Sequence, residues 1–234
     1  MTDPPPRVRE LQPDARPALE TIVDAVSSDP RAPSSVRDPG EAWRVHIADS
    51  LAALEFPDLR EASAIADLGA GAGFPGLPLA VTLRSAHVDL IEATTRKCEF
   101  MRRVIRDAGI ANARVICERS EEWAAFGPPG GGRGAYDAVA ARAVGRLSTL
   151  AELASPLLVE GGVLVAWKGR RDPDEEAELE RAMARLAICR EEVRWVGPYA
   201  GSRNRHLHLL RKRGPTPAGL PRRPGMAKKR PFGS

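Results

Sequence analysis

Two periodicities of hydrophobic positions alternate along this 234-residue chain. Near its beginning, apolar residues recur three and four positions apart over residues 19–26 and again over residues 43–54. This spacing is that of one buried helix face, and several prolines with Gly40 separate the two segments. We therefore expect residues 1–60 to form an N-terminal helical cap. Residues 1–14 contain four prolines and little apolar content, which favours disorder or loose packing.

Beyond residue 60, short apolar runs alternate with amphipathic stretches, which is typical of a parallel sheet covered by helices on both faces. Two final runs without a helix between them predict an antiparallel edge pair. Residues 61–213 are therefore expected to form one domain with a mostly parallel, seven-stranded sheet, followed by a basic tail at 214–234. Gly161-Gly162 predicts a turn, and residues 127–134 a surface loop. The expected strands are 64–66, 88–91, 115–117, 136–141, 163–167, 192–196 and 206–210, and the longer helices 77–83, 95–108, 147–158 and 174–188.

A glycine-rich turn follows the first predicted strand. Residues 67–76 read Asp-Leu-Gly-Ala-Gly-Ala-Gly-Phe-Pro-Gly, so Gly69, Gly71 and Gly73 alternate with other residues. Glycine adopts positive φ readily and lets a ligand approach the bare backbone. A strand, a glycine turn and a helix start bring backbone N–H groups against a nucleotide-like ligand.

The glycine pattern leaves two ligands open. Gly71, Gly73 and Gly76 satisfy the dinucleotide pattern G-x-G-x-x-G, so an NAD(P)-dependent oxidoreductase is one interpretation. However, Pro75 lacks the N–H that a pyrophosphate would use. S-adenosylmethionine has no pyrophosphate but has an amino-acid end, which Asp67 could hold directly or through water. Alternatively, Asp67 only caps the following helix and the glycines only form a turn.

Further polar side chains stand at the ends of the other predicted strands, where open α/β sheets bind their ligands. Glu92 is placed to take the two ribose hydroxyls of an adenosine, although a dinucleotide site needs an acid there too. Ser120 and Glu121 could frame an adenine or simply begin a helix. Arg142 could contact the cofactor, a guanine edge or a phosphate, or form a structural ion pair. Lys168 is expected either to meet RNA phosphate or to be solvated.

The charge distribution points to a polyanionic partner. The net charge is +4, yet the chain from Val193 onward has 11 basic and no acidic residues, leaving 24 basic and 31 acidic residues elsewhere. Such one-sided charge is the footprint of nucleic acid binding. We therefore expect Arg222, Arg223, Lys228 and Lys229 to contact RNA; the alternative is a solvated chain end.

Composition sets further expectations. A hydrophobic content of 43% and a charged content of 28% are typical of a soluble protein, and no apolar run is long enough to span a membrane. Cys98, Cys117 and Cys189 are widely spaced without a C-x-x-C pattern. We therefore expect neither a disulfide framework nor a metal site, but small core residues in a cytoplasmic protein. His46 could contact the pocket, but a packed, structural histidine is favoured.

The chain contains the motifs H-I-A-D-S-L at 46–51, D-L-G-A-G-A-G-F-P-G at 67–76, L-I-E-A at 90–93, R-S-E-E at 119–122, A-R-A at 141–143, W-K-G at 167–169 and P-R-R-P-G-M-A-K-K-R-P at 221–231. Together they resemble one family, the glucose-inhibited division protein B family of methyltransferases, which act on N7 of a guanine in small-subunit ribosomal RNA. The resemblance runs from about Val36 to the C-terminus. It implies cofactor contacts at Gly69, Phe74, Ser120, Glu121 and Arg142. Val45 departs from the pattern, because the family often has an arginine there.

The implied chemistry agrees with the residues. Guanine N7 has a free lone pair, so methyl transfer needs positioning rather than a catalytic base, and Arg142 is the one candidate for a direct role. Residues 140–144 lack the proline pair typical of amine methylation, and neither Cys98 nor Cys117 is placed as a nucleophile. We expect a monomeric class I methyltransferase that uses S-adenosylmethionine to methylate guanine N7 in 16S ribosomal RNA. The alternatives are the oxidoreductase, a small-molecule methyltransferase, and an RNA-binding protein without activity.

Overall fold

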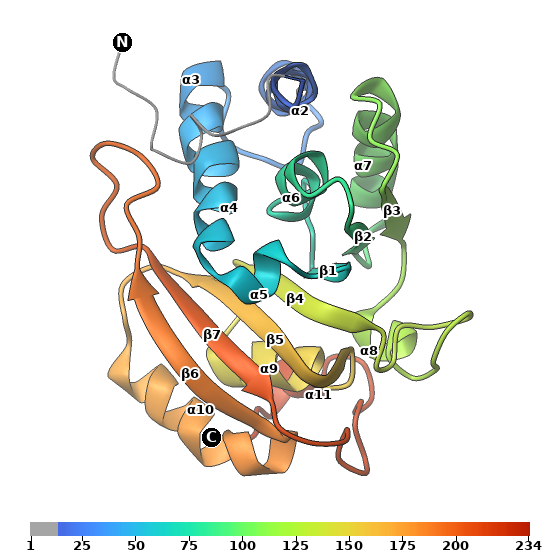
Figure 1. Cartoon of the computed structure of the whole chain (residues 1–234), viewed down its shortest axis with the longest axis vertical. Coiled ribbons are helices and arrows are strands. Elements are labelled where there is room, and N and C mark those ends of the chain that lie inside the picture. Colours follow the sequence, from blue (N-terminus) through green and yellow to red (C-terminus); the bar gives the residue numbers. More distant parts are fainter. Residues whose placement is uncertain (1–13) are drawn as a thin grey trace.

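The computed structural model describes residues 14–234 and is built around a seven-stranded sheet (Figure 1). The strand order is β3-β2-β1-β4-β5-β7-β6. Strands β1 to β5 run parallel, whereas β7 is antiparallel to both of its neighbours. The predicted fold class is therefore confirmed. The strands are β1 Ala64–Leu68, β2 His87–Ile91, β3 Ala113–Ile116, β4 Tyr136–Arg142, β5 Leu158–Lys168, β6 Ile188–Trp195 and β7 His206–Lys212.

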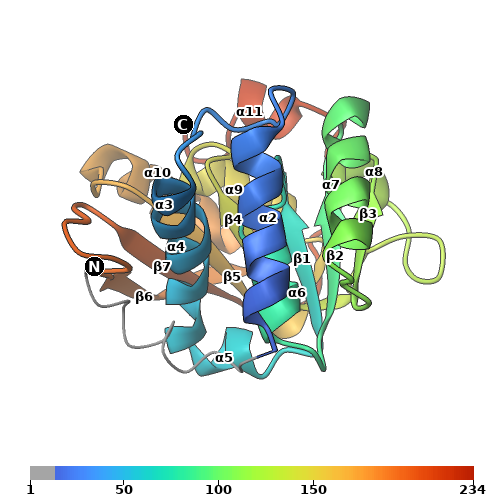
Figure 2. The same ribbon diagram turned by 90° about the horizontal axis from the view of Figure 1, so that it is seen from above.

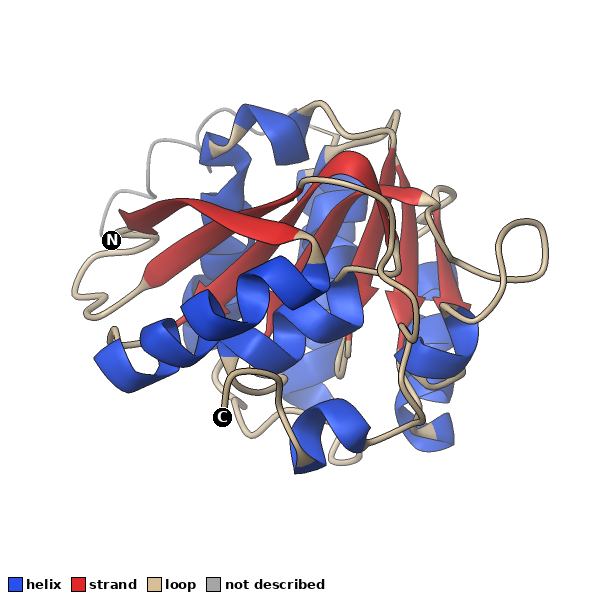
Figure 3. Cartoon of the chain, turned by 90° about the horizontal axis from the view of Figure 1, so that it is seen from below, coloured by secondary structure: helices blue, strands red, loops and turns tan. Residues whose placement is uncertain are grey.

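Helices cover both faces of the sheet and close a separate hydrophobic core against each. Figure 2 shows α2, α4, α6 and α7 side by side on one face. The view from below in Figure 3 shows the helices that cover the opposite face, where α9, α10 and α11 pack together. The helices are α2 Arg16–Ser28, α3 Pro39–Ala42, α4 Asp49–Leu51, α5 Pro57–Arg60, α6 Gly76–Thr82, α7 Thr95–Asp107, α8 Ser120–Trp123, α9 Leu147–Ala154, α10 Pro173–Leu186 and α11 Met226–Lys229.

The N-terminal helices share the core of the strands. The four apolar residues predicted to line one face of α2 are all buried. The second predicted helix is a nearly continuous helical segment in which a π-helical stretch, η1 (Trp43–Ala48), precedes α4, and a 3₁₀ stretch, η2 (Ala52–Glu55), follows it. Wider π-helical turns are frequent at functional sites, and this one carries His46.

One expectation about local structure is wrong. Gly161-Gly162 lies inside β5 rather than in a turn, because β5 begins at Leu158 and its pairing with β4 shifts register between Tyr136 and Ala138. The disorder expected for residues 1–14 falls outside the described residues, except for Asp14. Residues 127–134 contain neither helix nor strand, as expected for a loop. Within residues 14–234, no helix is both long and apolar enough to cross a membrane.

Candidate cofactor and RNA site

The glycine turn joins β1 to α6 and folds back over the end of β2. Gly69, Gly71 and Gly73 have φ angles of 70°, 60° and 94°, which non-glycine residues rarely adopt. The N–H groups of Gly69 and Ala70 both donate to the carbonyl of Ile91, at 2.9 and 3.0 Å. A Cβ atom on Gly69 would lie 2.8 Å from Val144 Cγ2. Backbone conformation therefore favours glycine at all three positions, and the space beside Val144 also requires it at Gly69.

Asp67 lies beneath this turn and is fully buried. Its Oδ2 accepts a hydrogen bond of 2.7 Å from the N–H of Gly76, at the start of α6. Burial raises the pKa of Asp67 to about 7, although the Gly76 N–H opposes this shift. Its Oδ1 has no hydrogen-bond partner among the described residues. Asp67 therefore caps α6 and supports the turn from below, and its contact with a cofactor ammonium group, direct or through water, stays a prediction.

Glu92 follows β2 and faces the turn. Its carboxylate accepts hydrogen bonds from the N–H groups of Gly71, at 3.2 Å, and Thr94, at 2.9 Å, and lies 3.5 Å from Lys97 Nζ. Burial opposes ionisation, but the Thr94 and Gly71 N–H groups and the Lys97 ammonium hold the pKa of Glu92 below its usual value. The ionised carboxylate retains lone pairs for further donors, as a pair of ribose hydroxyls would require.

A cavity of about 240 Å³ opens between the glycine turn, Glu92, α8 and the C-terminal tail. Four of the predicted cofactor residues line it, together with part of the C-terminal tail, which was not predicted to lie at this site. Its lining includes Gly69, Glu92, Ser120, Glu121, Val144, Thr149, Gly225, Ala227 and Lys228.

The C-terminal tail packs against the domain. Arg222 donates to both carboxylate oxygens of Glu152, at 2.6 and 2.5 Å, and Glu152 is buried. Glu121 Oε1 accepts the N–H of Gly225 at 2.7 Å. Arg222 is thus held in an ion pair with a buried carboxylate, and its expected contact with RNA stays a prediction. The other three predicted contacts, Arg223, Lys228 and Lys229, are exposed, and their RNA contacts stay predictions.

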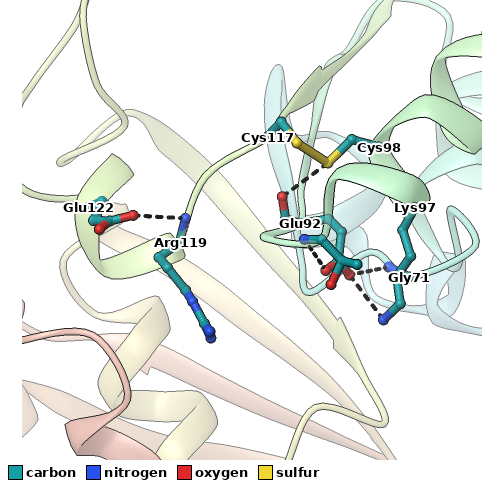
Figure 4. The surroundings of a disulfide bond; sticks show 8 residues. Gly71, Glu92, Lys97, Cys98, Cys117, Arg119 and Glu122 are labelled. Atoms are coloured by element: carbon teal, nitrogen blue, oxygen red, sulfur yellow. Dashed lines mark hydrogen bonds and ion pairs between the residues drawn. A yellow bond between two sulfur atoms is a disulfide. The ribbon is translucent and has the colours of Figure 1, made fainter.

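Cys98 and Cys117 form a disulfide, contrary to the expectation of separate core thiols. Figure 4 shows this bond beside Glu92, and Cys98 Sγ lies 3.2 Å from the Glu92 carbonyl oxygen. The two cysteines are 19 residues apart in sequence, but α7 packs on β3 and brings their Cα atoms to 5.9 Å. Cys189 is the remaining free cysteine in the described part of the chain.

Arg142 ends β4 and connects the sheet to the helical cap. Its Nη1 donates to Asp49 Oδ2 at 3.0 Å and to the Val45 carbonyl at 3.1 Å, and its guanidinium lies 5.4 Å from the centre of the Phe74 ring. The His46 ring stacks on the same Phe74 ring, with ring centres 4.3 Å apart. Burial and the Arg142 charge lower the pKa of His46 to about 4, so its ring is neutral. The predicted packed histidine therefore also helps hold the aromatic ring beside Arg142.

Arg142, Ala143 and Gly145 line a larger cavity of about 610 Å³, whereas Val144 between them lines the smaller one, so the two cavities adjoin at this segment. Lys168 is not solvated: its Nζ donates to Glu175 Oε1 at 2.7 Å and to the Gly145 carbonyl at 3.0 Å. Ala143, with φ of 59°, turns the chain between the two cavities. The lining is Val45, His46, Asp49, Arg142, Ala143, Gly145, Trp167, Lys168, Gly169, Val196, Arg205, His206 and Leu207. Asp49 and Arg205 were not predicted to have a role here.

Residues 32–207 match the family model described as rRNA small subunit methyltransferase G, GidB. The chain belongs to this family. Two curated relatives carry the name ribosomal RNA small subunit methyltransferase G. The protein from Rubrobacter xylanophilus is 38% identical over 84% of this chain and 75% of its own length. The protein from Sorangium cellulosum is 39% identical over 81% of this chain and 76% of its own length.

Solved structures confirm the fold expected of a GidB family member, a class I methyltransferase fold. The chain is similar to the Methanococcus jannaschii fibrillarin pre-rRNA processing protein, with a TM-score of 0.54 and 16% identity over 71% of this chain and 74% of that one. It is also similar to Aeropyrum pernix fibrillarin in complex with natively bound S-adenosyl-L-methionine, with a TM-score of 0.52 and 15% identity over 70% and 72% of the two chains.

The departure of Val45 from the GidB family pattern has a structural counterpart. At this position the backbone carbonyl, rather than a side chain, contacts Arg142. The preceding Arg44 is exposed. The anchoring of Arg142 therefore does not depend on which side chain stands at position 45.

Proposed function

We propose that this chain transfers the methyl group of S-adenosylmethionine to N7 of a guanine in the 16S RNA of the small ribosomal subunit. The observation that carries the proposal is the pairing of two adjoining cavities. The smaller one presents bare glycine backbone and the Glu92 carboxylate, and the larger one presents the cations Arg142, Lys168 and Arg205. A nucleoside cofactor and a polyanionic acceptor fit these two surfaces respectively.

The smaller cavity suits the adenosine end of the cofactor. Gly69, Glu92, Ser120 and Glu121 would hold it, and when bound it supplies a methyl group on a positively charged sulfur. The carboxylate of Glu92 is ionised and preorganised by backbone N–H groups, so it is ready to accept hydroxyl donors. Phe74 is buried beneath His46 and Arg142, and its contact with the cofactor stays a prediction.

The residues of the larger cavity would orient the guanine rather than remove a proton. Guanine N7 carries a lone pair, so no base has to act before attack. The neutral His46 is anchored within the cap, with its Nε2 2.9 Å from Ser34 Oγ. Lys168 and Arg142 are both fixed by buried carboxylates. Rigid cations of this kind can hold a phosphate or the guanine O6, which favours the in-line geometry that gives most of the rate acceleration.

The location and the oligomeric state of the enzyme are part of this proposal. Its substrate would place it in the cytoplasm with assembling small subunits, and we expect it to act as a monomer. Lys228, which lines the smaller cavity, and the exposed Arg223 and Lys229 would contact RNA phosphates. Replacing all three with glutamine should weaken subunit binding and flatten its salt dependence, because each lysine or arginine at a phosphate releases about one counterion.

The test is transfer of a labelled methyl group to small subunits from a strain that lacks this enzyme. Subunits from the parent strain, which are already modified, serve as the control and should accept little label. Calorimetry with S-adenosylhomocysteine and with a nicotinamide dinucleotide runs in parallel. Saturation by the dinucleotide alone, with no label in either subunit preparation, would overturn the proposal in favour of an oxidoreductase.

A further inference from the structure

The larger cavity contains one acidic side chain among its described lining residues, Asp49. It is 95% buried, with an exposed fraction of 5%. Its Oδ2 is held by Arg142, but its Oδ1 makes no hydrogen bond within residues 14–234. A buried carboxylate oxygen left without a donor in a cationic cavity calls for a ligand that supplies one.

Arg205 covers this oxygen without satisfying it. Its Nε lies 3.5 Å from Asp49 Oδ1 and also lacks a hydrogen-bond partner in the described chain. Arg205 stands at the end of the connection between β6 and β7, which lies beside α4 in Figure 1. Its side chain is 39% exposed, and its hydrogen bond is a 3.3 Å contact from Nη2 to the Tyr199 hydroxyl. Little therefore holds Arg205 over the carboxylate when a better donor arrives.

The chemistry of N7 methylation decides which edge of guanine such a donor would come from. Proteins most often recognise guanine through arginine on O6 and N7 together. That contact would occupy the lone pair that has to attack the methyl group. A methylating enzyme can instead hold the opposite, Watson–Crick edge, whose N1–H and N2–H groups are adjacent donors. A carboxylate accepts both, whereas adenine presents an acceptor at N1.

We propose that Asp49 is the specificity-determining residue for the target guanine, its carboxylate accepting the N1–H and N2–H groups once Arg205 moves aside. This proposal rests on the function proposed above. N7 stays free in this arrangement. Methyl transfer also leaves the purine with a positive charge, and the carboxylate is of the opposite sign. Asp49 should thus influence kcat as well as KM.

The test combines an enzyme substitution with a base substitution. Small subunits are assembled from 16S RNA ligated to carry guanine or inosine at the methylated position; inosine lacks the N2 amino group. For the wild-type enzyme, the loss of one hydrogen bond to a charged group should lower kcat/KM by about 10- to 100-fold. For Asp49→Asn, the rate with guanine should already be low, and inosine should lower it by less than about threefold.

Glu175→Gln is the matched control. Glu175 is a buried carboxylate that holds Lys168, as Asp49 holds Arg142, but it is not among the residues that line the cavity. Its substitution should slow the reaction while the guanine-to-inosine ratio stays at the wild-type value. Binding of S-adenosylhomocysteine by calorimetry should be unchanged in both variants, which shows that they are folded.

Two results would overturn this assignment. One is a wild-type enzyme that methylates inosine as fast as guanine, which needs no variant at all. The other is an Asp49→Asn enzyme that keeps the full guanine preference, because Asp49 would then only anchor Arg142. Absence of methylation on guanine subunits by the wild-type enzyme is a different outcome, since it would refute the proposed function itself.

Discussion

The ion pair between Arg222 and Glu152 gives the sharpest test of the docked C-terminal tail. Glu152 is 2% exposed and Arg222 is 20% exposed, and two short hydrogen bonds join them. Arg222 also donates to the Arg230 carbonyl, at 2.7 Å, and lies 4.0 Å from the centre of the Phe232 ring. Arg222→Met removes all of these contacts and leaves a buried carboxylate unpaired.

The expected cost follows from that burial. Removing one partner of a buried pair lowers the free energy of unfolding by about 3–5 kcal/mol. In a chain of this size each kcal/mol shifts Tm by about 2–4 °C, so Tm should fall by at least about 6 °C. Because Gly225, Ala227 and Lys228 line the smaller cavity, loosening the tail should also weaken binding of S-adenosylhomocysteine.

The assays are calorimetric unfolding and titration with S-adenosylhomocysteine. The control is Arg223→Met, which changes the exposed neighbouring arginine and should shift Tm by no more than about 2 °C. The double variant Glu152→Met/Arg222→Met should regain most of the lost stability, because no unpaired charge is left buried. Equal Tm and equal affinity in the Arg222 and Arg223 variants would refute the docking of the tail.

Three further predictions concern the cofactor side. Glu92→Gln should weaken S-adenosylhomocysteine binding by about 10- to 100-fold in calorimetry at pH 7, since hydrogen bonds to a charged group are lost; an affinity equal to that of wild type would exclude ribose recognition by Glu92. Gly73→Ala places a Cβ 2.2 Å from Leu77 Cδ1 at a φ of 94° and should lower Tm by several degrees. Gly130→Ala, where no described atom lies within 4 Å, should leave Tm unchanged. Equal Tm values for the two variants would contradict the tight turn. Burial raises the pKa of Asp67 from 3.8 to about 7, so the folded state binds an extra proton and stability is lost as pH rises from about 4 to 7. The Tm of Asp67→Asn minus the Tm of wild type should therefore rise across that pH range. A constant difference would show that Asp67 titrates normally.

The sheet could be predicted from the sequence because each strand and helix has a recognisable local pattern of apolar and turn residues. The four apolar positions of α2 and the turn glycines could be recognised without knowing what lies across from them. The strand-end rule then placed Glu92 and Ser120 at one cavity and Arg142 and Lys168 at its neighbour, because parallel strands end at one edge.

What the sequence did not predict depends on pairs that meet only in three dimensions. Arg222 and Glu152 are 70 positions apart, so the tail looked like free positive charge. Cys98 and Cys117 come together only because α7 packs on β3. The burial of Asp67 under the glycine turn also has no signature in the local pattern. The motif at 46–51 contains Asp49, but the role proposed for Asp49 depends on Arg205. Arg205 directly precedes β7, far from Asp49 in the sequence.

The most direct measurement of the central claim maps the modified base. Small subunits methylated by the purified enzyme with S-adenosylmethionine are reduced and treated with aniline, which cleaves RNA at N7-methylguanine, and the 16S fragments are read by primer extension. We predict one new, enzyme-dependent cleavage at a single guanine, which is lost when the cofactor is omitted. Incorporation of methyl groups without any such cleavage would contradict methylation at N7.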